Sequence, residues 1–462
     1  MGMKYKRLAA LICILCLSVS TAFGIQDTKK NEQKVEYTNE VHSVFSLKDC
    51  IEIAIANNPE IRTSIYNEEA YKSKIGQAWA AYFPIIDAGV DISRSRNHYS
   101  HIKNSSNYYR SMSYTMGYVP NLSAGMLLFD FGKTKAVADM AKSMYKASKE
   151  DTKENINTII YDIKATYYNI LFAQAQVKVY EDTVNDFKLQ REQAHEFWEI
   201  GIKPKIDYVT AEYNLGKAQL NLVKAENVLK VAQVQLSKIM GIPKYTNYEL
   251  SDDLTLNKFD ISEENAIKTA METRPELLSA EQSVKAAKMS LRAARRGFTP
   301  DIGIYGSYGN GLGSEYNLSS AQVGVGLSYK GLNLMESKKQ VDEVKAEYKK
   351  SQAQLESVRD AVYLNVKKTY IDLQTDMEAI VIAKLALDQA KEQYRQVTGR
   401  YKAGVGDAIE LKDGENTYLN ARLDFYNSIL NYNVTAANLE KEIGVPIAIT
   451  QEKVLDISKE DL

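Results

Sequence analysis

Residues 156–177 read INTIIYDIKATYYNILFAQAQV, and one set of side chains in this stretch steps regularly by four and three positions. The set is Ile156, Ile160, Ile163, Tyr167, Ile170, Gln174 and Val177. A second stretch keeps the step at Tyr363, Val366, Tyr370, Leu373, Met377 and Ile380. Steps of four and three place side chains on one face of a helix, so both stretches predict coiled-coil seams.

The helices that carry these seams are predicted to be very long. Residues from about 131 to 199 and from about 334 to 402 contain no proline and only an isolated glycine near either end. At 1.5 Å per residue, such a helix extends roughly 100 Å, far beyond one globular core. Return helices over about 205–240 and 407–443 alternate small and large residues, which favours close packing. Glycine-bearing turns at 201–204 and 404–407 join the helices into two antiparallel hairpins.

The chain is internally duplicated. Eight positions recur 216 residues later, so that Ile51, Ala54, Pro59, Glu60, Ala70, Lys72, Ala78 and Pro84 match Ile267, Ala270, Pro275, Glu276, Ala286, Lys288, Ala294 and Pro300. Nine more recur 203 residues later, so that Tyr145, Lys164, Tyr167, Gln190, Gly201, Glu212, Ala218, Gly241 and Pro243 match Tyr348, Lys367, Tyr370, Gln393, Gly404, Glu415, Ala421, Gly444 and Pro446. We therefore predict two structural repeats, 46–243 and 261–446, with a linker at 244–260 and a tail at 447–462.

Each repeat also contains a predicted β-hairpin, at about 85–130 and 300–331. Val323, Val325 and Leu327 alternate with small residues, which is the period of a strand. The turn at 309–314 is rich in glycine, as hairpin loops are. The first hairpin is longer, and its loop around 98–109 is predicted to lie outside the cell. The only two neighbouring histidines, His98 and His101, fall there and are interpreted as polar loop residues rather than metal ligands.

The N-terminus has the three regions of a secretory signal peptide, predicted as residues 1–24. Residues 25–45 are polar and are predicted to be flexible. Two of the three cysteines lie in the signal, which leaves Cys50 alone and excludes an intramolecular disulfide. The signal carries three positive charges, so the net charge of −1 becomes −4 in the mature chain. This near-neutral charge argues against nucleic acid as a partner.

No other stretch approaches the ~18 to 20 apolar residues of a membrane-spanning helix, so any crossing would need β-strands. Four strands per chain are too few, because closed membrane barrels have at least about eight. The sequence therefore predicts a barrel shared between chains. No nucleophile motif, phosphate loop or cofactor fingerprint is present, so we predict no enzyme activity, no cofactor and no metal site.

The order of these features resembles the TolC family of outer-membrane efflux and secretion channels. The resemblance is carried by the Asn58-Pro59 and Arg274-Pro275 breaks, the Phe83-Pro84 and Thr299-Pro300 entries to the β-hairpins, and the two glycine-tipped helical hairpins. It implies a mainly α fold with a small β part, in which a homotrimer forms a 12-stranded β-barrel in outer-membrane lipid and an α-barrel in the periplasm. It also implies a periplasmic adaptor protein and an inner-membrane pump or ABC exporter. The alternative is a secreted or surface coiled-coil scaffold without a pore.

The resemblance further assigns roles at the helix tips. Glu410 and Asp413 would ring the periplasmic entrance, with Asp207 and Thr210 at the equivalent places in the first repeat; the plain alternative is a solvated helix face. Asp207 and Tyr401 would latch neighbouring hairpins. The arginine expected in that latch is replaced by Gly406, for which Lys205 or Lys402 could substitute. Gly201, Pro204, Gly404 and Gly406 would contact the adaptor, and the aromatic pair Phe197 and Trp198 is interpreted as either core or a docking patch.

Overall fold

The computed structural model describes residues 43–100, 110–244, 248–256, 258–259, 261–313, 317–329, 334–444 and 449–450. The predicted signal peptide, His101 and most of the C-terminal tail lie outside these residues. The first repeat contains α2 (Leu47–Asn57), α3 (Pro59–Trp79), the 3₁₀ turn η1 (Ala80–Tyr82), β2 (Ile85–Ser100), β3 (Arg110–Phe129), α4 (Lys133–Glu199) and α5 (Lys205–Ile239). The second contains α6 (Glu263–Thr273), α7 (Pro275–Arg295), η2 (Arg296–Phe298), β6 (Asp301–Gly313), β7 (Asn317–Ser328), α8 (Leu334–Lys402) and α9 (Ala408–Ile443).

Local sequence explains the helix breaks that open each repeat. Ser46 caps α2 through a reciprocal capping box with Asp49. At the break between α2 and α3, the side-chain oxygen of Asn58 accepts hydrogen bonds from the main-chain N–H groups of Glu60 and Ile61. Pro59 then occupies the first turn of α3, where its missing N–H costs nothing. Pro275 does the same for α7.

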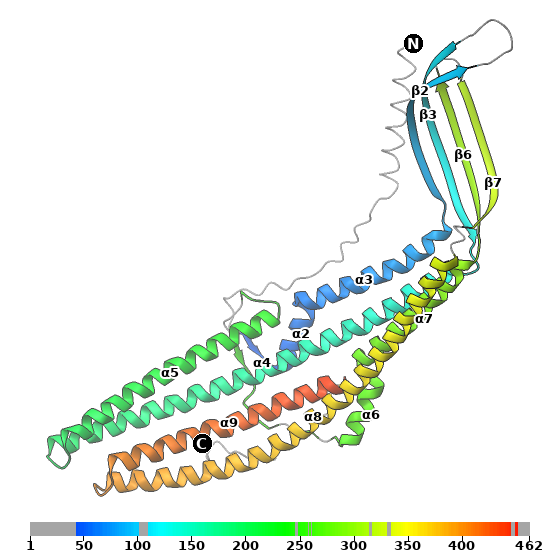
Figure 1. The fold of residues 1–462 in the computed structure, drawn as a ribbon. Helices are drawn as coiled ribbons and strands as arrows, with labels where there is room; N and C mark the ends of the chain where they lie inside the picture. The colour runs from blue at the N-terminus through cyan, green and yellow to red at the C-terminus, as the bar shows by residue number, and fades with distance from the viewer. Residues whose placement is uncertain are drawn as a thin grey trace, which may run out of the picture. The chain divides into compact units, whose positions relative to one another are not determined.

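The two β-hairpins join into one antiparallel sheet with the strand order β2-β3-β6-β7 (Figure 1). Strand β3 of the first repeat pairs with β6 of the second, for example at Leu122 and Tyr308. One register shift interrupts this pairing between Leu127 and Phe129. The sheet therefore combines both repeats, and β2 and β7 are its edge strands within the described part of the chain.

Side-chain hydrogen bonds hold the strand ends to the helix ends. Asp130, which is 1% exposed, accepts hydrogen bonds from the Tyr82 hydroxyl at 2.7 Å and from the main-chain N–H of Gly132 at 3.0 Å. Arg296 donates to the carbonyl of Gly132 at 2.7 Å. The Tyr329 hydroxyl donates to the carbonyl of Phe298 at 3.1 Å. These bonds fix where the sheet begins relative to η1, η2 and α4.

The long helices form two hairpins, α4 with α5 and α8 with α9, and α4 also contacts α9 of the other hairpin (Figure 1). The predicted seams are buried at Ile163, Tyr167, Ile170, Val366 and Ile380. The predicted fold class is confirmed: long helical hairpins dominate, and two β-hairpins form the small sheet. None of the described helices combines the length and the apolar character that a membrane span requires.

Short strands appear in segments predicted to be flexible or linking. Strand β1 (Ser43–Phe45) pairs in parallel with β4 (Tyr248–Leu250), and β5 (Lys258–Phe259) pairs with β8 (Ile449–Thr450). The rings of Phe45 and Tyr248 are buried with their centroids 5.5 Å apart, which supplies an apolar anchor for the first pair. Strands of two or three residues are too short to show a period of two, so the sequence pattern did not reveal them.

Candidate functional site at the helix tips

Each helical hairpin ends in a tight turn that requires glycine. Gly201 has φ 79° and Gly404 has φ 78°, a left-handed conformation that other residues rarely adopt. The N–H of Gly201 donates to the carbonyl of Trp198, and that of Gly404 to the carbonyl of Tyr401. Pro204 then precedes the first residue of α5. The predicted tip residues thus form two turns with the same construction.

Gly406 closes the second tip so tightly that no side chain fits. Its N–H donates to the Arg400 carbonyl at 3.0 Å. A Cβ atom at this position would lie 2.7 Å from the backbone nitrogen of Tyr401, which explains sterically why arginine is absent here. The carbonyl of Gly406 instead accepts a hydrogen bond from Lys203 Nζ at 3.2 Å, and this bond links the two tips. The substitutes suggested from sequence were Lys205 and Lys402; the Nζ of Lys205 lies over the Trp198 ring, 5.6 Å from the centroid.

The two predicted latch residues lie near each other without a direct bond. Tyr401 is 3% exposed, and its ring centroid lies 6.2 Å from that of Phe197. Burial raises the pKa of Tyr401, and the nearby carboxylates of Asp207 and Asp407 raise it further. Among the described residues no hydrogen bond joins the Tyr401 hydroxyl to Asp207, so the latch stays a prediction.

The two predicted entrance carboxylates differ in their surroundings. Glu410 lies in the first turn of α9, and its Oε1 is 3.0 Å from Nη1 of Arg400. Asp413 lies one turn further on and is exposed, and in the described part of the chain its carboxylate forms no ion pair. Arg400 therefore offsets the charge of Glu410, while the charge of Asp413 stays uncompensated.

Aromatic side chains from both helices of the first hairpin pack together at its tip. The rings of Trp198 and Tyr208 stack with centroids 5.8 Å apart and 9° between their planes. The ring of His195 meets both of them edge-on. Phe197 points instead to Tyr401 of the other hairpin. Phe197 thus belongs to the contact between the tips, whereas Trp198 remains 36% exposed.

Above the tips, three pairs of polar side chains join α4 to α9. Along this contact, Lys164 pairs with Glu440, Arg422 Nη2 lies 2.8 Å from Asp182 Oδ2, and Gln190 Nε2 donates to Glu415 Oε2 at 2.8 Å. We call these three pairs the α4–α9 seam. These bonds must change if the two hairpins move apart.

Glu415 is the most unusual member of the seam. It is 3% exposed, and its second oxygen, Oε1, has no hydrogen-bond partner. Burial raises the pKa of Glu415 to about 8, while the bond from Gln190 opposes the shift and the charge of Asp186 adds to it. Burial also raises the pKa of Asp186, which accepts a hydrogen bond from the Tyr394 hydroxyl. Burial thus favours the neutral form of the Glu415 carboxyl, which contributes to the contact between the two hairpins by accepting the hydrogen bond from Gln190.

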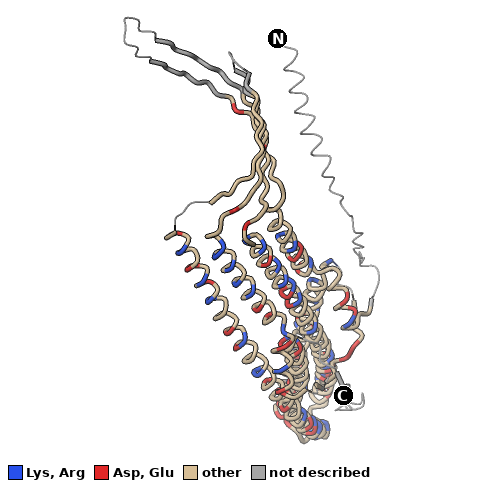
Figure 2. Tube along the Cα trace, turned by 90° about the vertical axis from the view of Figure 1, so that its right-hand side faces the viewer, with Lys and Arg blue, Asp and Glu red and all other residues tan. Residues whose placement is uncertain are grey.

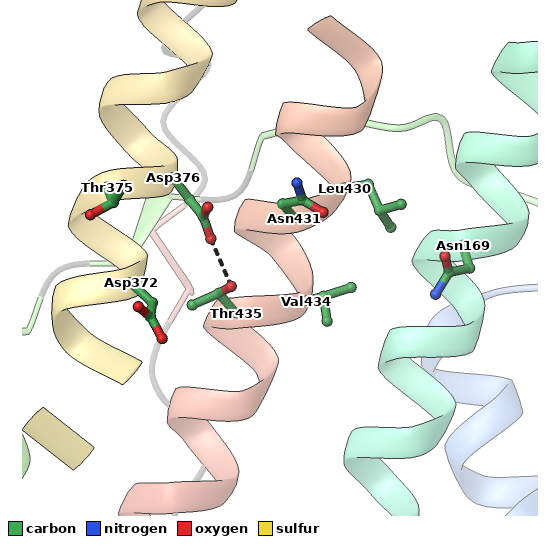
Figure 3. Close-up of a pocket in the computed structure, with 8 residues that line it drawn as sticks. All are labelled: Asn169, Asp372, Thr375, Asp376, Leu430, Asn431, Val434 and Thr435. Carbon is green, nitrogen blue, oxygen red and sulfur yellow. Dashed lines mark hydrogen bonds between the residues drawn. The ribbon is translucent and has the colours of Figure 1, made fainter. Parts of the chain in front are cut away.

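A polar groove of about 380 Å³ opens between α4, α8 and α9 (Figure 3). Its lining residues are Asn169, Asp372, Thr375, Asp376, Leu430, Asn431, Val434 and Thr435. The Thr435 hydroxyl donates to Asp376 at 2.7 Å across the groove. The described residues contain no group of three or more His, Cys, Asp or Glu side chains placed to hold a metal ion.

The groove continues an exposed polar face of α9. This face steps by four and three residues through Asp413, Thr417, Asn420, Asp424, Asn427 and Asn431. It carries amides, a hydroxyl and carboxylates but no basic residue. Such a surface remains hydrated and offers hydrogen bonds along the length of the helix.

Long helical hairpins joined to a small antiparallel sheet, without a catalytic or metal-binding constellation in the described residues, define the structural class of the outer-membrane channels. The comparisons agree with this class. The sequence profile of the outer membrane efflux protein family matches residues 50–242 and 266–445. The chain belongs to this family, and it is an outer-membrane efflux channel protein whose helical part lies in the periplasm.

Relatives of this chain include outer membrane proteins from two bacteria. The probable efflux pump outer membrane protein TtgC of Pseudomonas putida is 23% identical over 414 residues, which cover 86% of this chain and 83% of that protein. The outer membrane protein TolC of Escherichia coli is 23% identical over 428 residues, which cover 84% and 80%. These matches confirm the predicted family resemblance and decide against the scaffold alternative.

Solved structures show the same fold. The Campylobacter jejuni CmeC outer membrane channel aligns with a TM-score of 0.75 at 18% identity over 90% of this chain and 88% of that one. The open state of the Neisseria gonorrhoeae MtrE outer membrane channel aligns with a TM-score of 0.70 at 20% identity, covering 86% and 89%. At this level of identity the likeness concerns the fold alone.

Proposed function

We propose that three copies of this chain assemble into one conduit, a passive exit duct from the periplasm that is energised by partner proteins. The observation that carries this proposal is that the single chain leaves apolar side chains unpartnered on two helices at opposite sides of the hairpin layer. On α5 the exposed residues are Ile206, Val209, Tyr213, Leu220 and Val223. On α8 they are Leu364, Ile371, Ile382 and Leu385.

A neighbouring copy would cover both faces. Among the described helices, α5 packs mainly on α4, and α8 turns its other side to α7 and α9. Packing α5 of one protomer against α8 of the next removes both apolar faces from water, which favours association. The edge strands β2 and β7 would pair in the same way, and three four-stranded sheets would give twelve strands. The polar face of α9 would then line the conduit.

The assembly can be tested on the α5 surface. Replacing Leu220 and Val223 with glutamate places two charges in the proposed interface, so the purified protein should run as a monomer on native gels and lose heat-modifiable migration. The control Gln219→Glu, on an exposed position of the same helix, should leave the oligomer intact. A Leu220→Glu/Val223→Glu variant that still forms trimers and conducts ions in a planar bilayer would contradict the proposal.

We further infer that the helix tips bind a periplasmic adaptor that leads to an inner-membrane pump or exporter. The apolar side chains of Ile200, Ile202 and Val405 are exposed beside the turns at 201–204 and 404–407. Exposed apolar groups of this kind are favourable docking points. Replacing Ile202 and Val405 with aspartate should abolish export in cells while channel conductance stays normal. Loss of conductance as well would show that the tips serve the pore itself.

In this assembly, Asp413 and Glu410 of three protomers would face one another at the periplasmic entrance. Crowded carboxylates attract cations and repel anions. Because Arg400 pairs with Glu410, Asp413 contributes most of that field. Lys203, Tyr401 and Asp207 would hold the tips together beside this entrance.

A further inference from the structure

Helix α7 carries a line of basic side chains that none of the functions above uses. Lys285, Lys288, Arg292 and Arg295 step by three, four and three residues and are all exposed, so they share one face of the helix. In the described part of the chain, no carboxylate lies within ion-pairing distance of these four side chains. We call them the α7 basic face.

This face is not buried by the neighbouring helices. Helix α7 packs against α4 and α8 of its own chain, and Ala286 and Leu291, at other positions around the helix, are buried. Because α7 lies between two helices of the same protomer, it is not an edge helix that a second copy would cover. The four positive charges therefore stay available to another partner after assembly.

The chain places the α7 basic face directly beside the sheet. Arg295 precedes the first residue of β6, Asp301, by six positions, and η2 lies between them. Lys285 lies ten residues further back, which is about 15 Å along the helix. Figure 2 shows that charged residues are frequent on the helices and rare on the described parts of the strands.

The base of the sheet presents an apolar surface to its surroundings. On β7 the side chains of Val323, Val325 and Leu327 alternate on one face and are 84%, 67% and 69% exposed. Leu327 pairs with Ile302 at the start of β6. If these side chains face lipid, as the channel proposal requires, the lipid headgroups lie at the level of η2 and the last turns of α7.

The internal repeat points to the same boundary. Trp79, at the end of α3, occupies the position equivalent to Arg295, since the two residues are 216 positions apart. Its ring is 41% exposed and stacks on Tyr82, with centroids 6.0 Å apart. Tryptophan and basic residues are the two side-chain types that concentrate at membrane interfaces. Equivalent positions of the two repeats thus carry the two kinds of interfacial anchor.

We propose that the α7 basic face binds the anionic headgroups of phospholipids in the periplasmic leaflet of the outer membrane. This inference rests on the proposed channel function, because it needs the sheet to lie in the membrane. Arg292 and Arg295 would contact phosphate groups, to which guanidinium groups donate paired hydrogen bonds. Lys288 lies about 6 Å along the helix from Arg292, within the screening length of about 8 Å that applies at physiological ionic strength, whereas Lys285 lies beyond that length and would contribute less. The contact sets the depth of the protein in the membrane and selects the lipids around it.

Lipid binding by the purified assembly tests the proposal. The full-length protein in detergent is titrated with short-chain phosphatidylglycerol or with phosphatidylcholine of the same chain length, and bound lipid is counted by native mass spectrometry. The wild type should prefer phosphatidylglycerol. The variant K285Q/K288Q/R292Q/R295Q should lose about tenfold in affinity for phosphatidylglycerol and little for phosphatidylcholine. The variant R292K/R295K keeps the charge and should retain the preference.

A charge-matched control removes two exposed lysines from α4, in the variant K178Q/K188Q, and is compared with the double variant R292Q/R295Q. It should keep the preference for phosphatidylglycerol, because these lysines lie far from the strands along the chain. Equal loss in both variants, or an unchanged preference in the α7 variant, overturns the proposal. A changed ion selectivity of the reconstituted α7 variant would also overturn it, since the face would then line the conduit. A wild type that neither forms trimers nor conducts ions would instead contradict the channel function.

Discussion

Replacing Glu415 with glutamine should remove a pH-dependent weakness from the contact between the two helical hairpins. Burial raises the pKa of Glu415 from 4.5 to about 8, so the folded chain retains a proton that the unfolded chain releases. The stabilisation from this proton is complete below the unfolded pKa and is lost as the pH rises through the folded pKa. Glutamine has nearly the same shape, stays neutral, and can accept the hydrogen bond from Gln190.

The size of the effect follows from the shift. Between pH 6 and pH 8 the wild type should lose roughly 2 kcal/mol per protomer, with little further loss above the pKa of about 8. Thermal unfolding followed by circular dichroism across this range should show a falling Tm for the wild type and a flatter profile for Glu415→Gln. Glu181→Gln, at an exposed position on α4, is the control and should follow the wild type. Parallel profiles for the wild type and Glu415→Gln would refute the reasoning.

Three further predictions concern the tips and the seam. Asp413→Asn should reduce the cation selectivity of the reconstituted channel more than Glu410→Gln does, because Arg400 already compensates the charge of Glu410. Reversal potentials in a salt gradient measure the selectivity of both variants, and equal reductions would contradict this prediction. Gly406→Ala should lower the Tm, because a Cβ atom there would force the backbone at Tyr401 to shift. Gly216→Ala, in open space on α5, should leave the Tm unchanged. An unchanged Tm for Gly406→Ala would show that the turn can relax. Arg422→Ala should weaken the α4–α9 seam by about 1 kcal/mol, since the side chain of its partner Asp182 is 47% exposed. The same variant should speed hydrogen exchange in α4 and α9, whereas Arg422→Lys should retain much of the protection from exchange.

The parts of the fold that could be predicted are those with long, regular patterns. The step of four and three residues located the seams of α4 and α8, because it is repeated over many turns and leads to buried residues such as Ile163 and Val366. The alternation around Val325 located the second β-hairpin for the same reason. The pairs β1–β4 and β5–β8 were missed, since a strand of two or three residues has no measurable period.

At the tips, residue types could be assigned from the sequence but contacts could not. The glycine turns at 201 and 404 follow from the chemistry of their backbone. The hydrogen-bond donor to the Gly406 carbonyl could not be predicted in this way, because Lys203, Lys205 and Lys402 are equally plausible donors until the turns are folded. The pairing of Arg400 with Glu410 was missed for a related reason, since it joins two helices across a turn whose geometry decides which charges meet.

Glu415 shows where the internal repeat misleads. It is equivalent to Glu212, and two glutamates at matching positions predict matching surroundings. Yet Glu212 is exposed, whereas Glu415 is buried against Gln190. The difference arises because α9 contacts α4 of the first hairpin, while α5, the equivalent helix, lies at the edge of the protomer. In the proposed trimer α5 gains α8 of the next protomer as its neighbour, and α8 is the repeat equivalent of α4. Within one chain, duplication therefore conserves the helices but completes only one of the two contacts between hairpins. In the proposed trimer, α5 and α8 of neighbouring protomers would make the equivalent contact, which would bring Glu212 toward Gln393, the repeat equivalent of Gln190.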